Sequence, residues 1–87
     1  NRRFAARVFS EKEQEYALAR GGKIETFAGM FAAKEAAVKA TGGVITDYEV
    51  LHYPSGKPYI LSDRFIYELS ISHCESYAIA FVIAMER

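Results

Sequence analysis

The chain has 87 residues, of which 51% are hydrophobic, and its 11 basic and 11 acidic side chains leave no net charge. This length fits one domain spanning 1–87, and the composition excludes a disordered segment and argues against a nucleic-acid-binding protein. No apolar run reaches the roughly 20 residues of a membrane-spanning helix, and the single cysteine, Cys74, is typical of a reducing compartment, so we expect a cytoplasmic protein.

Three helices are predicted in the N-terminal part of the chain. Residues 2–9 have a helical pattern. Ser10 and Glu13 form a capping box, which starts a second helix that ends near Arg20, before a glycine pair. A third helix is predicted from about residue 23 to residue 40, where a second glycine pair stops it. Six basic side chains against three acidic ones in the first 23 residues indicate a surface that could attract an acidic partner.

After the helices the hydrophobic period changes to that of strands. Residues 47–53 and 59–61 are predicted to form a hairpin around the turn at 54–58. Residues 67–73 alternate and are predicted to pair antiparallel with 77–85, whose continuous apolar character predicts cover on both faces. Helices followed by antiparallel strands indicate an α+β domain.

Glu35 is the first candidate site residue. A helical projection places it near the middle of an apolar stripe, where a carboxylate needs compensation. Either it forms a structural ion pair with Lys39, one turn further on, or it holds a metal such as Mg²⁺ or acts as a base. Lys34 is predicted to point into solvent. The stripe consists of Ile24, Phe27, Ala28, Phe31 and Val38.

Two histidines and a turn complete the candidates. His73 ends a strand at the rim of the sheet, where it could reach a ligand or could be a satisfied edge histidine. His52 has no partner that the sequence predicts. The turn at 55–58 carries Lys57 at its tip, but it is not a phosphate-binding loop of the Walker type.

Four stretches together resemble one family. Residues 27–40 are similar to its W/F-x-x-K-E-A-x-x-K-A signature, 69–82 contain a match to its S-[IL]-[ST]-H signature, and Gly-Lys-Pro at 56–58 and the segment 2–13 occur in the family's order. The chain thus resembles the holo-acyl carrier protein synthases, the small, usually trimeric class of 4′-phosphopantetheinyl transferases.

The resemblance implies a function and roles for residues. It implies Mg²⁺-dependent transfer of 4′-phosphopantetheine from coenzyme A to a serine of apo-acyl carrier protein in fatty acid biosynthesis, by a homotrimer. Glu35 would bind Mg²⁺, Lys39 would approach the coenzyme A phosphates, and His73 would lie near the diphosphate. A loop would pack against the nucleotide end of coenzyme A in a neighbouring subunit: Gly56, Lys57 and Pro58. Arg3 and Arg7 fall near the expected docking region for the carrier protein.

The chain departs from the family pattern in two places. The strand that carries the second Mg²⁺ ligand, an aspartate, is expected before Asn1, so we expect a 4′-phosphopantetheinyl transferase-like fold without its first strand, in a fragment of a longer protein. Met30 stands where relatives commonly have arginine. Two alternatives remain: a non-catalytic interaction domain with a buried Glu35–Lys39 pair, and a module that binds a nucleotide without transferring a group.

Overall fold

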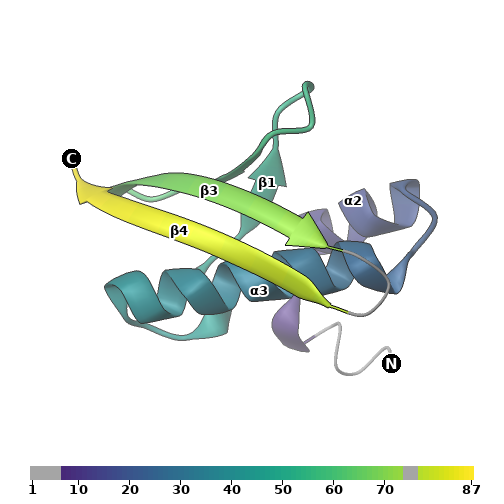
Figure 1. Cartoon of the computed structure of the whole chain (residues 1–87), viewed down its shortest axis with the longest axis horizontal. Coiled ribbons are helices and arrows are strands. Elements are labelled where there is room, and N and C mark those ends of the chain that lie inside the picture. The colour runs from purple at the N-terminus through teal and green to yellow at the C-terminus, as the bar shows by residue number, and fades with distance from the viewer. Residues whose placement is uncertain (1–6, 74–76) are drawn as a thin grey trace.

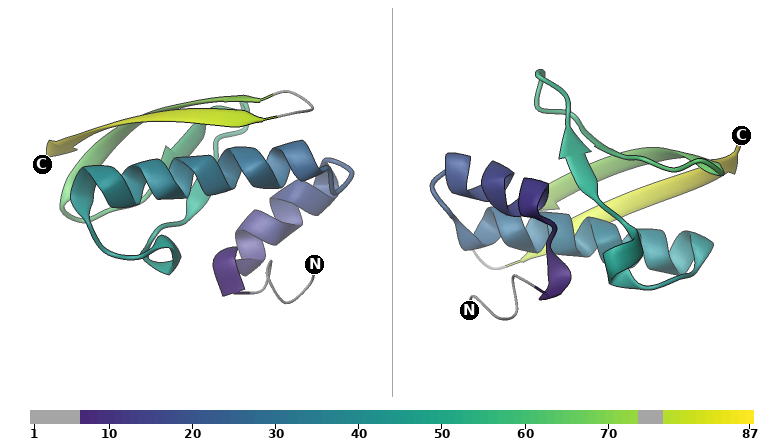
Figure 2. Two further views of the ribbon diagram at one scale, coloured as in Figure 1. Left: turned by 60° about the horizontal axis from the view of Figure 1, so that its bottom comes forward. Right: turned by 180° about the vertical axis from the view of Figure 1, so that it is seen from behind.

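The computed structural model describes residues 7–73 and 77–87, with only the backbone of His73. Its elements, in chain order, are α2 (Glu11–Ala19), α3 (Ile24–Thr41), a 3₁₀ helix η1 (Ile45–Asp47), β1 (Val50–His52), β2 (Pro58–Ile60), β3 (Phe65–His73) and β4 (Ala78–Glu86). The helix α3 lies along the hairpin of β3 and β4 (Figures 1 and 2). No helix in the described ranges is long and apolar enough to cross a membrane.

Local signals set the helix boundaries. The hydroxyl of Ser10 accepts the amide of Glu13 at 3.2 Å, and the Glu13 carboxylate accepts the amide of Ser10 at 2.8 Å, so the predicted capping box is confirmed. The bounds of α3 agree with the prediction within one residue. The helix predicted at 2–9 falls mostly outside the described residues. Of its positions, only 7–9 are described, and 7–8 are helical. The structure therefore describes two α-helices where three were predicted.

The strands form two antiparallel pairs. One pair joins β1 to β2, with His52 opposite Pro58. The other joins β3 to β4 over nine residues, which confirms the predicted pairing. The strand β1 begins later than predicted, because Asp47 accepts the amide of Val44 at 2.8 Å and closes the turn of η1 instead. Residues 74–76, which the predicted pairing of 67–73 with 77–85 leaves as the connection, lie outside the described residues.

The fully buried side of α3 combines three small residues with Met30 and Lys34, none of which belongs to the predicted stripe. Gly29, Ala33 and Ala37 are buried there, and Ala80 on β4 is packed against this core. Small side chains let the helix axis approach the strands closely, so this face outcompetes the one chosen by residue size. Of the predicted stripe, Phe27 and Phe31 are partly buried and pack against this core, whereas Ile24 is 80% exposed, so the prediction that the stripe faces the core is correct only in part.

The strand β4 has one covered face and one open face. Its exposed side chains alternate with the covered ones, as expected for a strand with a face in solvent. The prediction that both faces are covered is therefore wrong for the described chain. Four large apolar side chains, which we call the β4 apolar face, are between 45% and 73% exposed: Ile79, Phe81, Ile83 and Met85.

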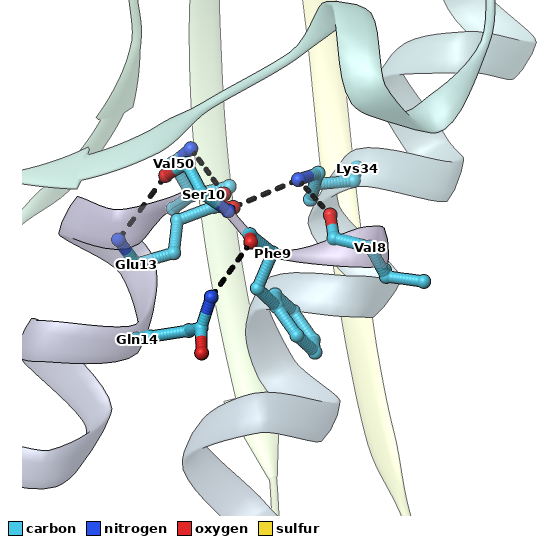
Figure 3. Close-up of polar contacts among 7 residues, drawn as sticks. All are labelled: Val8, Phe9, Ser10, Glu13, Gln14, Lys34 and Val50. Carbon is cyan, nitrogen blue, oxygen red and sulfur yellow. Dashed lines mark hydrogen bonds and ion pairs between the residues drawn. The ribbon is translucent and has the colours of Figure 1, made fainter. Parts of the chain in front are cut away.

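A buried ion pair joins α2 to α3 (Figure 3). The ammonium of Lys34 donates to the carboxylate of Glu13 at 2.8 Å and to the carbonyl of Val8 at 2.6 Å. The second carboxylate oxygen of Glu13 accepts the amide of Val50 at 2.7 Å. Both side chains are at most 1% exposed, so the prediction that Lys34 points into solvent is wrong. One contact network thus fixes both helices and the start of β1.

We expect Lys34→Met to reduce the free energy of unfolding by about 3–5 kcal/mol, because it leaves the Glu13 carboxylate buried without its counter-charge. The matched control is Lys39→Met on the exposed side of the same helix, which should change that energy by less than about 0.5 kcal/mol. Urea denaturation followed by circular dichroism measures both. Equal losses in the two variants would contradict the role given to the buried pair.

Candidate functional site

The exposed side of α3 carries two of the predicted site residues. Glu35 and Lys39 are both exposed, and their spacing of four residues puts them one turn apart on the same side of the helix. The prediction that Glu35 faces the core of its own chain is therefore wrong. The Glu35 carboxylate needs no compensating partner inside the chain, because it is exposed to solvent.

Two anchors hold this side of α3 toward solvent. Lys34 is fixed on the core side by Glu13, and successive helical residues are rotated by about 100°, so Glu35 must point away from the core. At the end of the helix, the hydroxyl of Thr41 lies 2.7 Å from the Tyr48 hydroxyl and 2.8 Å from that of Tyr67. The orientation of Glu35 is therefore set by neighbours that do not contact it.

Glu35 alone supplies the chemistry of a partial metal site. Among the residues that the structure describes, no three His, Cys, Asp or Glu side chains gather closely enough to hold a metal ion. An exposed carboxylate still suits Mg²⁺, which binds one or two carboxylates and takes its remaining ligands from phosphate and water. The donor set therefore fits one protein ligand of a magnesium–phosphate complex.

The β1–β2 hairpin presents the second group of predicted residues. Gly56 has φ +91°, a conformation that favours glycine, and its amide donates to the carbonyl of Tyr53 at 2.8 Å. Lys57 is exposed in this turn. Gly56 and Pro58 line a pocket of about 130 Å³ together with residues of α2 and of the N-terminal half of α3. A cation thus stands at the tip of the hairpin, beside a small hollow.

His52, for which the sequence predicted no partner, has one. Its ring stacks on that of Tyr16 from α2, with ring centroids 3.6 Å apart and planes within 1° of parallel. Burial lowers the pKa of His52 below its ordinary value of 6.5, the positive charge of Arg20 lowers this pKa further, and Glu13 opposes both effects. The imidazole is therefore neutral near pH 7. Stacking between residues 36 positions apart leaves no periodic signal in a sequence.

The predicted site residues form two groups within one chain. Glu35 and Lys39 lie in the C-terminal half of α3 and do not line the hairpin pocket. The hairpin turn, in contrast, lies over the N-terminal half of that helix. His73 ends β3 opposite Ala78, and its side chain is outside the described part. Ile71, two residues earlier, lines the hairpin pocket, so the end of β3 runs close to the hairpin group. Arg3 is outside the described residues, and Arg7 is exposed.

A larger pocket lies elsewhere, between residues 7–10 and 46–49. Its volume is about 370 Å³, and Lys34 forms part of its wall. Because Lys34 already donates to Glu13 and Val8, it has little capacity left for a ligand. None of the catalytic or cofactor-binding residues predicted from the sequence lines this pocket, and we do not assign it a role.

Comparison with known proteins gives a consistent result. The model of the 4′-phosphopantetheinyl transferase superfamily matches residues 1–82. A holo-[acyl-carrier-protein] synthase of Halalkalibacterium halodurans is 48% identical over 93% of this chain and 76% of its own length. One from Fusobacterium nucleatum is 37% identical over 94% and 81%. The crystal structure of a Helicobacter pylori holo-[acyl-carrier-protein] synthase in complex with coenzyme A superposes with a TM-score of 0.83, at 28% identity, over 95% of this chain and 82% of that one.

The lowered pKa of His52 predicts a pH dependence of stability. The unfolded imidazole gains a proton as the pH falls through 6.5, while the folded one resists, so the unfolded state binds more protons. As the pH is lowered from about 7.5 to 5.5, the free energy of unfolding of the wild type should therefore fall relative to that of His52→Phe. Above that range the difference between the two proteins should be constant. Urea titrations at several pH values measure it, and parallel curves for the two proteins would refute the assignment.

Proposed function

Because the chain belongs to the 4′-phosphopantetheinyl transferase superfamily and is therefore a transferase, we propose that it is a holo-[acyl-carrier-protein] synthase. In this reaction the serine hydroxyl of apo-acyl carrier protein attacks the β-phosphorus of coenzyme A, and 3′,5′-ADP leaves. The observation that carries the proposal is the shared fold with a synthase solved in complex with coenzyme A. We place the activity in the cytoplasm, in fatty acid biosynthesis.

The exposed side of α3 supports a role for Glu35 and Lys39. Glu35 would hold Mg²⁺, which when bound neutralises diphosphate oxygens and polarises the phosphorus. The ammonium of Lys39, one turn away, would stabilise the negative charge that grows on the leaving group. A carboxylate in the site, or a water bound to it, accepts the proton of the attacking serine. We assign His73 to the neighbourhood of the diphosphate, as the resemblance implies.

The separation of the two residue groups supports a site completed between copies of the chain. In the proposed homotrimer, Gly56, Lys57 and Pro58 of one copy contact the nucleotide end of a coenzyme A molecule whose diphosphate lies near Glu35 of another. The β4 apolar face supports the assembly, because a large exposed apolar surface is typical of an interface.

A non-transferring module that binds a nucleotide is the second candidate. The small pocket beside Lys57 favours this candidate, because a single chain then offers both a cation and a hollow. The two candidates differ in one outcome, because only the synthase leaves the carrier protein heavier by one 4′-phosphopantetheine group.

We expect the full-length protein, incubated with coenzyme A, Mg²⁺ and apo-acyl carrier protein, to produce the modified carrier, as seen by mass spectrometry. Glu35→Gln should lower the transfer rate by about 100-fold, because an amide replaces the charged ligand. Chelation of Mg²⁺ should stop transfer by the wild type.

The matched control is Glu15→Gln, an exposed carboxylate on α2, which should transfer at the wild-type rate. Thermal unfolding should be nearly the same for all three proteins. The absence of any mass gain with the wild type would reject the synthase, and full activity of Glu35→Gln would reject its role as metal ligand.

The β4 apolar face predicts a change of oligomeric state. Phe81 is 73% exposed in the single chain, so Phe81→Glu should leave the fold intact but place a charge in the interface. Sedimentation velocity should show a trimer for the wild type and a smaller species for the variant. Leu18→Glu places the same charge at an exposed apolar position of α2, away from the β4 apolar face, and this control should sediment as the wild type does. A wild-type monomer at micromolar concentration would contradict the assembly.

A further inference from the structure

A short hairpin needs support from outside itself. The strands β1 and β2 have three residues each and share three register pairs. An isolated two-stranded hairpin is at best marginally stable in water, and this one is shorter than most. The conformation of its turn therefore depends on what the hairpin packs against.

The hairpin packs against β3, α3 and α2, and the contact with α2 involves the end of β1 and the turn. His52 is the last residue of β1, and its ring stacks flat on Tyr16 at 3.6 Å. The guanidinium of Arg20, one turn after Tyr16, lies 4.7 Å from the centre of the Tyr16 ring. A terminal nitrogen of Arg20 also lies 3.9 Å from the place where Gly56 would carry a Cβ atom. The helix thus touches the hairpin at the end of one strand and at the turn.

The protonation state of His52 suits this arrangement. Its Nδ1 atom is buried and has no hydrogen-bond partner within the described residues. Two charged groups act on it: Arg20, the residue just after the end of α2, opposes protonation, and Glu13 of α2 favours it. A neutral ring packs against Tyr16 without adding a positive charge beside Arg20.

We propose that the stack of Tyr16 on His52 positions the Gly56–Lys57–Pro58 turn and thereby sets the affinity of the site for coenzyme A. This inference rests on the proposed function, because it assigns that turn to coenzyme A. Tyr16 and His52 are positioning residues. They act through the backbone of the turn, since His52 stands opposite Pro58 in the hairpin register. The loss of the stack frees the turn, and binding then includes the entropic cost of ordering it.

Steady-state transfer kinetics with coenzyme A as the varied substrate test this role. His52→Ala removes the stack and should raise KM for coenzyme A by about threefold to tenfold, with kcat within about twofold of wild type. His52→Phe keeps an aromatic ring on Tyr16 and should have the wild-type KM. An unchanged KM in His52→Ala, a KM as high in His52→Phe as in His52→Ala, or a fall in kcat alone would each overturn the proposal.

Hydrogen exchange without coenzyme A separates this inference from the proposed function. The Gly56 amide, bonded to the Tyr53 carbonyl, should exchange faster in His52→Ala than in the wild type and at the wild-type rate in His52→Phe. Amides of β3 and β4 should exchange equally in all three proteins. If the wild type transfers nothing, the synthase assignment fails, and exchange still decides whether the stack holds the turn. Equal exchange of Gly56 in all three overturns the positioning role.

Discussion

The buried pair of Lys34 and Glu13 is the interaction on which the arrangement of this chain depends. Two charges removed from water are costly unless they are paired and hydrogen-bonded. Here the ammonium of Lys34 and both carboxylate oxygens of Glu13 have hydrogen-bond partners. Glu13 caps its own helix, neutralises Lys34 and holds the amide that begins β1. The pair selects one rotation of α3, and that rotation determines which residues of the helix remain accessible.

Much of the fold could be predicted from the sequence, because capping residues, glycine pairs and alternation are local signals. The bounds of both described helices and the pairing of the long strands follow from them. The rotation of α3 could not be predicted from apolar size. Besides Met30, its fully buried face consists of alanine and glycine, which a search for large apolar residues passes over, and of a lysine whose partner lies 21 positions away.

For the candidate site, the sequence indicated candidate residues, but it did not predict what surrounds them in the fold. Glu35 and Lys39 were proposed from helix geometry and then from the motif that resembles the family's, but the geometric reason given for Glu35, an inward carboxylate, was wrong. His52 was passed over because its partner, Tyr16, is distant in the chain and stacking has no sequence period. The motif was sufficient to identify the family, whereas the geometry of the site depends on long-range contacts that the motif does not contain.

The strand β4 has one covered face and one exposed apolar face, and this difference matters while a newly made chain folds. A ribosome completes α3 and β3 before β4, so the alanine-rich side of β4 finds its docking surface as soon as it is made. The apolar side finds none in its own chain. When chains are produced in excess of their folding and assembly capacity, this exposed apolar side is therefore an aggregation hazard.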